Sequence, residues 1–173
     1  MSTFVQVCVG FTAVSIVTAA AVQDIRERLI SNRLVLLLLM FGVLHHVAVA
    51  NSVTDWLLIA GSAFALAVFV FLVGFMVWRL GSLGGGDAKL LVSAAFFVGP
   101  DGALLLFAGT ALAGGALALA YLLVPKVLPL VASRFADPAT LGSHEHATSL
   151  PYGVAIAAGF TGTVVPSLPM LIG

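Results

Sequence analysis

Residues 56–78 read WLLIAGSAFALAVFVFLVGFMVW, a stretch without a single Asp, Glu, Lys or Arg. A helix needs about 20 consecutive apolar residues to cross the hydrocarbon core of a bilayer. The sequence therefore predicts a membrane-spanning helix here. The rest of the chain has the same character, because 61% of its 173 residues are hydrophobic and 8% are charged, with a mean hydropathy of +1.19. Soluble domains carry about 25% charged residues, so an ordinary soluble globule is excluded.

Working outward from this stretch, we find five further apolar segments. The six predicted spans are Phe4–Gln23, Leu34–Ala50, Trp56–Trp78, Ala88–Gly99, Gly102–Val124 and Tyr152–Ile172. The fourth is short, because about 12 residues rise only about 18 Å as a helix, against a core of about 30 Å. We therefore expect an all-α integral membrane protein with about six transmembrane helices, the fourth short. Residues 1–173 are expected to form a single transmembrane domain.

The basic residues all lie on one side of a six-span arrangement. They are Arg26, Arg28, Arg33, Arg79, Lys89, Lys126 and Arg134. The positive-inside rule makes that side cytoplasmic and places both termini outside. Seven acidic residues balance them, so the formal net charge is zero, and the electrostatic footprint of a nucleic-acid-binding protein is missing.

Two acidic residues lie at the cytoplasmic ends of their predicted spans. Asp24 follows the first apolar segment, and Asp87 follows the glycines of residues 84–86. Taken singly, Asp24 reads as a solvated charge at the membrane surface and Asp87 as a helix cap. Three consecutive glycines, however, favour a place where the backbone turns sharply or approaches another segment closely. Two carboxylates at one depth can share a proton and hydrolyse a peptide bond, one as base on water and the other as acid on the carbonyl.

The motifs around both acids resemble those of the type IV prepilin peptidases, which belong to the Gly-x-Gly-Asp intramembrane aspartic peptidases. Three motifs carry the resemblance, in the family's order: Asp24-x-Arg26…Ile30-x-Asn32, Gly84-Gly85-Gly86-Asp87-Ala88-Lys89-Leu90 and Pro151-Tyr152-Gly153. Together they extend over nearly the full chain. One departure lies in the first motif, where Ser31 occupies a position at which family members often carry proline.

The resemblance implies a role for each matching residue. Asp24 and Asp87 would be the catalytic pair, and Gly84 and Gly86 would shape the backbone beside Asp87. Three residues would lie near the active site: Lys89, Arg26 and Asn32.

The resemblance also implies an activity and a location. The protein would be an aspartic endopeptidase that removes the basic leader peptide from prepilins or pseudopilins at the cytoplasmic face of the bacterial inner membrane. Its partners would be the prepilin and the lipid bilayer, with no nucleic acid, cofactor or metal. The chain is short and has Cys8 as its single cysteine. It therefore resembles the short peptidases of tight-adherence (Flp) pilus systems, which argues against the methyltransferase activity of the larger members.

Two other classes of function remain open from the residues alone. Paired intramembrane acids and glycine-broken helices also occur in small ion- or proton-coupled transporters, although the acids here lie at span ends rather than at the midplane. A non-catalytic assembly subunit would need only the small residues spaced four apart, which let helices pack closely. These pairs are Gly109 with Ala113, Ala111 with Gly115, and Ala155 with Gly159. The sequence leaves the oligomeric state open.

The remaining polar residues have simpler interpretations. His144 and His146 flank Glu145 in a long polar loop, but a closed zinc site takes four ligands, so a surface role is favoured. His45 and His46 are predicted at the outer interface, away from the two acids. Helix starts and turns account for the outer acids, Asp55 and Asp101.

Overall fold

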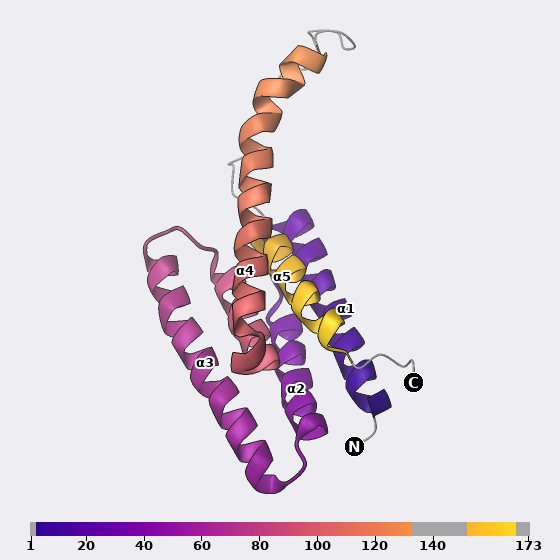
Figure 1. The fold of residues 1–173 in the computed structure, drawn as a ribbon. Coiled ribbons are helices and arrows are strands. Elements are labelled where there is room, and N and C mark those ends of the chain that lie inside the picture. The colour runs from indigo at the N-terminus through magenta and orange to yellow at the C-terminus, as the bar shows by residue number, and fades with distance from the viewer. Residues whose placement is uncertain (1–2, 133–151, 169–173) are drawn as a thin grey trace.

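The computed structural model describes residues 3–132 and 152–168, and every element within them is an α-helix (Figure 1). The five helices are α1 (Thr3–Glu27), α2 (Asn32–Val49), α3 (Val53–Arg79), α4 (Gly85–Ala132) and α5 (Tyr152–Ser167). Helices α1, α2, α4 and α5 pack together, while α3 lies beside α4 at the edge of the molecule (Figure 1). The predicted all-α fold is confirmed.

Four helices are long and apolar enough to cross a membrane, as expected of a membrane protein. They are Phe4–Glu27, Asn32–Val49, Val53–Arg79 and Gly85–Ala120. Helix α5, with 16 residues, is shorter than a typical span of about 20. The predicted count of six spanning helices is therefore not supported. The predicted fourth and fifth spans fall within α4 (Gly85–Ala132), on either side of a break at Gly99.

Gly99 divides α4 into two arms, residues 85–98 and 100–132. Its φ of 64° and ψ of −174° interrupt the helix, and a positive φ of this kind is one that glycine adopts without a steric penalty. Pro100 follows, where the missing N–H and the fixed φ suit the first turn of a new helical stretch. The boundary predicted between the fourth and fifth apolar segments, Ala88–Gly99 and Gly102–Val124, falls at this break.

The second arm of α4 runs antiparallel to α5. A Cβ placed on Gly102 would lie 3.0 Å from the Thr163 side chain, and one on Gly114 would lie 3.6 Å from Ala155. Later residues of this arm thus meet earlier residues of α5.

The first arm of α4 runs in the other direction, alongside α2. At its start, a Cβ placed on Gly86 would lie 3.1 Å from Ile30, just before α2. Near its end, Phe96 lies 2.9 Å from the Cβ position of Gly42, ten residues into α2. The chain therefore reverses direction at Gly99. The first arm runs away from the end of the molecule at which α4 begins, and the second arm runs back toward it (Figure 1).

Small residues bring α4 and α5 into backbone contact. A Cβ placed on Gly109 would lie 2.9 Å from the Gly159 Cα, and one on Gly159 would lie 2.7 Å from the Leu106 carbonyl oxygen. No side chain fits between the two helices at this level. The predicted packing role is confirmed for Gly109 and Gly159, whereas it is wrong for Gly115, whose Cβ would meet no described residue within 4 Å.

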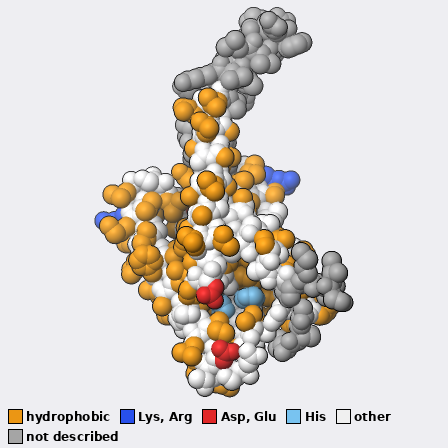
Figure 2. All heavy atoms as spheres, in the orientation of Figure 1, with side chains coloured by type: hydrophobic (Ala, Val, Ile, Leu, Met, Phe, Trp, Pro, Cys, Tyr) orange, Lys and Arg blue, Asp and Glu red, His pale blue; other side chains and the backbone are white. Residues whose placement is uncertain are grey.

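The core lies between α1, α2, α4 and α5, and the outer faces are apolar as well. The largest fully buried side chains include Leu38, Leu90, Phe97 and Phe160. Large apolar side chains also cover the outside of the molecule, as Figure 2 shows, and Phe64 of α3 is 63% exposed. Such a surface suits hydrocarbon rather than water.

Charge is distributed unequally between the two ends of the molecule. We call one of them the Asp24 end; it is formed by the last residues of α1 and α3 and the first residues of α2, α4 and α5. Five basic residues lie there: Arg26, Arg28, Arg33, Arg79 and Lys89. On the face in Figure 2, Lys and Arg side chains lie toward this upper end, whereas acidic and His side chains lie lower down. The Lys126 side chain and Arg134 lie outside the described residues.

Candidate active site

Asp24 lies in the last turn of α1 and is held by the start of α5. Its side chain is buried, with 6% of its surface exposed. The Gly153 backbone N–H donates a hydrogen bond of 3.0 Å to Asp24 Oδ2 across 129 positions of sequence. The interpretation of Asp24 as a solvated charge at the membrane surface is therefore wrong.

Asp87 is the third residue of α4, and Gly84 is the residue that caps this helix. The Gly84 carbonyl oxygen accepts the N–H of Ala88 at 3.0 Å, and the Asp87 carboxylate accepts a hydrogen bond from the Gly84 backbone. In a capping box, the side chain of the third helical residue accepts a hydrogen bond from the backbone N–H of the capping residue, and Asp87 makes this half of the motif. Asp87 thus belongs to the first turn rather than being the N-cap itself.

One oxygen of Asp87 has no hydrogen-bond partner within residues 3–132 and 152–168. Asp87 is 8% exposed, and its Oδ1 is fully buried without a hydrogen bond. A buried acceptor in this state costs about 1–3 kcal/mol. Asp87 Oδ1 can therefore accept a proton, or a hydrogen bond from another group in the site.

The structure brings the two acids together. Asp24 and Asp87, from α1 and α4, are close enough for their carboxylates to interact electrostatically. In general, two carboxyl groups close to one another repel when both are charged, and a single proton held between them removes that repulsion.

The three glycines before Asp87 differ in their surroundings. A Cβ on Gly84 would lie 2.5 Å from Asp87 Oδ2, and one on Gly86 would lie 3.1 Å from Ile30 Cβ. A Cβ on Gly85 would make an ordinary contact of 3.4 Å with Trp78. The positive φ in this loop belongs to Gly81, so close approach, rather than a left-handed backbone, explains Gly84 and Gly86.

Gln23 fixes the turn that joins α1 to α2, a role that sequence reasoning missed. Its Oε1 accepts the backbone N–H of Ser31 at 3.0 Å, and its Nε2 donates to Glu27 Oε2 at 3.0 Å. Ser31 also caps α2, since its hydroxyl accepts the Arg33 N–H at 3.2 Å. A proline at position 31 would have no N–H for Gln23, so the departure from the resembled motif has a local structural use. The only sign of this role in the sequence is that Gln23 is a polar residue next to Asp24.

The other predicted neighbours also lie at the Asp24 end. Lys89 Nζ donates to Asn32 Oδ1 at 3.2 Å, which links the start of α4 to the start of α2. Both side chains are exposed, as is Arg26. The structure places these residues around the acids rather than in the buried contact between them.

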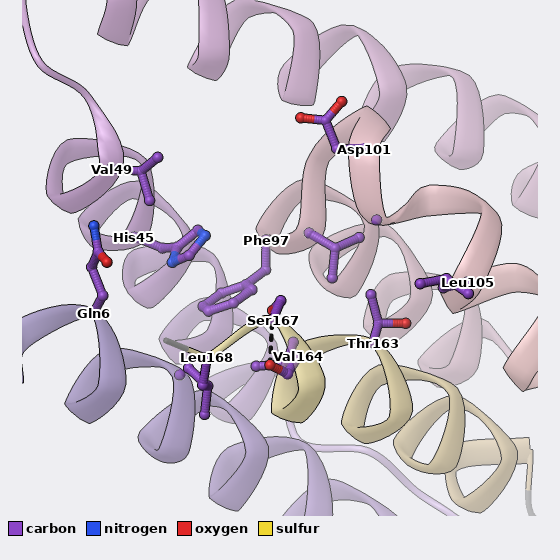
Figure 3. Close-up of a pocket in the computed structure, with 13 residues that line it drawn as sticks. Gln6, His45, Val49, Phe97, Asp101, Leu105, Thr163, Val164, Ser167 and Leu168 are labelled. Carbon is purple, nitrogen blue, oxygen red and sulfur yellow. Dashed lines mark hydrogen bonds between the residues drawn. The ribbon is translucent and has the colours of Figure 1, made fainter. Parts of the chain in front are cut away.

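A separate cavity of about 350 Å³ lies at the opposite end of the molecule (Figure 3). It is lined by residues of α1, α2, α4 and α5, among them Gly10, His45, Phe97 and Asp101. Gly10 precedes Asp24 by 14 positions in α1, or about 21 Å at 1.5 Å per residue. This cavity is therefore remote from the acid pair.

The two histidines near this cavity have packing roles. The His46 Nε2 lies 2.9 Å from the Phe96 carbonyl oxygen, and the His45 ring stacks on Phe97 with centroids 4.7 Å apart. Within residues 3–132 and 152–168, no group of three or more His, Cys, Asp or Glu is arranged to hold a metal ion. The predicted surface role of His144 and His146 concerns residues outside these ranges.

The fold and the site together define a helical membrane protein in which two buried carboxyl groups interact electrostatically at one end of the helices. Residues 11–119 match the family model described as the type IV leader peptidase family. The match covers more than half of the chain, so the protein belongs to the type IV leader peptidase family, a family of aspartic peptidases. The resemblance found in the sequence is confirmed. Comparisons with curated proteins and with solved structures found no match.

Proposed function

We propose that Asp24 and Asp87 are the catalytic pair of a prepilin leader peptidase. The observation that carries this proposal is the buried Asp87 carboxyl group, whose Oδ1 has no hydrogen-bond partner among the described residues and which interacts electrostatically with a second buried carboxyl group, Asp24. Family membership supplies the reaction, peptide hydrolysis. The geometry supports this pair because no other acid of the described residues is buried in this way.

The proposed reaction uses both acids in opposite protonation states. Asp24, as the carboxylate, takes a proton from water while the water oxygen bonds to the scissile carbonyl carbon. Asp87, as the acid, gives its proton to the carbonyl oxygen. The resulting diol then collapses: its C–N bond breaks, Asp24 gives its proton to the leaving amine, and a diol hydroxyl returns its proton to Asp87. No covalent intermediate forms, and both acids recover their starting states.

We further propose that the Asp24 end faces the cytoplasm. The basic residues of the described chain gather at this end, which is the distribution that the positive-inside rule associates with the cytoplasmic side. The reversal at Gly99 lets α4 enter and leave the membrane through the same end. The chain would then pass through the membrane six times within five helices, with both termini outside. Cleavage of a prepilin leader at this end would take place at the cytoplasmic surface of the inner membrane.

The substrate is proposed to be an Flp-like prepilin or a pseudopilin, with cleavage of its basic leader and without subsequent methylation. The proposal follows from the resemblance of the motifs around Asp24 and Asp87 and from Cys8 as the single cysteine of the sequence. The catalytic glycine loop, Gly84 and Gly86, and the surrounding Lys89, Arg26 and Asn32 would shape access to the acids.

The test is cleavage by the purified protein. We expect detergent-solubilised protein to cut a candidate Flp prepilin once, with a new amino terminus identified by mass spectrometry. Asp24→Asn and Asp87→Asn should each abolish cleavage, because an amide cannot exchange the required proton. Asp55→Asn and Asp101→Asn, at the opposite end, are the matched controls and should retain full turnover. Cleavage by either variant of the pair at the unsubstituted rate would remove that acid from the mechanism.

A further inference from the structure

We propose that Gly153 is a positioning residue of the peptidase, which fixes the Asp24 carboxylate relative to the helix that carries Asp87. The inference rests on the proposed function, since it takes Asp24 and Asp87 as the catalytic pair. Gly153 lies outside residues 11–119, the part of the chain that matches the family model. Its role is therefore drawn from the structure of α5 and its contacts.

The first observation is the hydrogen bond between Gly153 and Asp24. The Gly153 N–H lies in the first turn of α5, where backbone N–H groups have no partner within the helix. It donates to Asp24 Oδ2 at 3.0 Å, and both residues are buried. The start of a helix favours negative charge, so this bond holds Asp24 in one orientation and suits its carboxylate form.

The second observation is steric. A Cβ placed on Gly153 would lie 3.0 Å from both Asp24 Cβ and Asp24 Oδ2, and 3.2 Å from Asp24 Cγ. These distances are shorter than an ordinary contact between carbon atoms, about 3.5–4.0 Å. Any side chain at position 153 would therefore push the Asp24 side chain or the start of α5 away.

The third observation explains how this contact reaches Asp87. Further along α5, Gly159 packs directly against the backbone of α4 at Leu106. Helix α5 is thus fixed against α4 at one level and against Asp24 at another. Leu106 lies on the second arm of α4, which joins the first arm and Asp87 through Gly99. Helix α5 therefore contacts both Asp24 and the element that carries Asp87. A shift of Gly153 would change the alignment of the pair without touching Asp87.

The first experiment compares two alanine variants of α5. Gly153→Ala adds a Cβ against Asp24, whereas Gly162→Ala adds one where nothing lies within 4 Å. A displacement of about 1 Å at a catalytic group can reduce the rate about 100-fold. We expect Gly153→Ala to lower kcat by about that factor with little change in KM, and Gly162→Ala to leave both unchanged. A kcat for Gly153→Ala equal to that of Gly162→Ala would overturn the proposal.

A second variant separates the lost hydrogen bond from the added Cβ. Replacing Gly153 by glycolic acid substitutes an ester oxygen for the N–H and adds no side chain. Hydrogen bonds to charged groups are worth more than neutral ones, and we expect a loss in kcat of about tenfold or more. Unchanged kcat in this variant would show that the N–H does not position Asp24.

A spectroscopic measurement is independent of cleavage. In protein labelled with ¹⁵N-glycine, the amide resonance missing from Gly153→Ala identifies Gly153. We expect Asp24→Ala to move this amide proton to higher field, because its carboxylate acceptor is gone, and Gly162→Ala to leave it in place. An unmoved resonance in Asp24→Ala would overturn the proposal even if cleavage depends on Asp24. If Asp24→Ala moves the Gly153 resonance but the unsubstituted protein cleaves no prepilin, the contact between Gly153 and Asp24 stands and only the proposed function is rejected.

Discussion

Ile30 packs against Gly86, so that the turn between α1 and α2 touches the residue immediately before Asp87. A Cβ on Gly86 would lie 3.1 Å from Ile30 Cβ and 3.4 Å from the Ile30 backbone nitrogen. The turn that follows Asp24 and the loop that precedes Asp87 therefore form one contact. The absence of a side chain at position 86 is what lets them meet.

This contact predicts that Gly86→Val reduces cleavage about 100-fold, because the added carbons push the Asp87 loop away from the Asp24 turn. Gly85→Ala is the matched control, since its Cβ would make only an ordinary contact with Trp78. Initial cleavage rates at equal amounts of inserted protein measure the difference.

The same contact predicts a compensating pair. Ile30→Gly removes the Cβ that a Cβ at position 86 would meet at 3.1 Å, so it should restore part of the rate that Gly86→Ala loses. A double variant no faster than Gly86→Ala alone would mean that Ile30 is not the limiting contact. The rates of the two single variants and the double variant give the coupling between the positions.

Gln23 predicts a smaller effect. Gln23→Met keeps the length of the side chain but removes the acceptor for the Ser31 N–H. A neutral hydrogen bond is worth about 1 kcal/mol, which corresponds to roughly a fivefold lower rate if the whole effect appears in the transition state. Gln23→Glu combined with Glu27→Gln retains an acceptor oxygen for Ser31 and a donor between positions 23 and 27, and should cleave faster than Gln23→Met. Equal rates for both variants would contradict a role for the Ser31 bond.

Gly159 predicts a loss of stability. Gly159→Ala places a Cβ 2.7 Å from the Leu106 carbonyl oxygen, and overpacking of this kind costs about 1–3 kcal/mol. Gly115→Ala, whose Cβ would meet nothing within 4 Å, should be neutral. Thermal unfolding in detergent, followed by circular dichroism, measures both. An unfolding midpoint for Gly159→Ala as high as that of Gly115→Ala would show that α4 and α5 separate without loss of stability.

A mechanism based on two carboxylates predicts that metal chelation has no effect. Cleavage should proceed at the same rate in EDTA as in buffer, because the proton transfers of Asp24 and Asp87 need no metal ion. Inhibition by EDTA that added zinc reverses would contradict the proposed chemistry. In that case, full activity of the double variant His144→Ala with His146→Ala would show that these two histidines do not bind the zinc.

The sequence by itself determined the class of protein and the residues of interest, because both are recorded in local patterns. Long apolar stretches such as residues 56–78 exclude a soluble fold regardless of tertiary contacts. The motifs at Asp24 and at Gly84-Gly85-Gly86-Asp87 are short and contiguous, so the order of residues along the chain is enough to indicate the family. Uneven distribution of Lys and Arg is likewise a property of the chain.

Only the tertiary structure decided how these residues meet. Hydropathy marked the boundary near Gly99, but the direct reversal of the chain there depends on the backbone conformation of that one residue. The Gly153–Asp24 bond joins residues 129 positions apart, a contact that no local pattern encodes. The close approach of Ile30 to Gly86 depends on how three helices pack. Sequence periodicity fixes which residues enter a helix, whereas the alignment of the two acids depends on packing between helices distant in the chain.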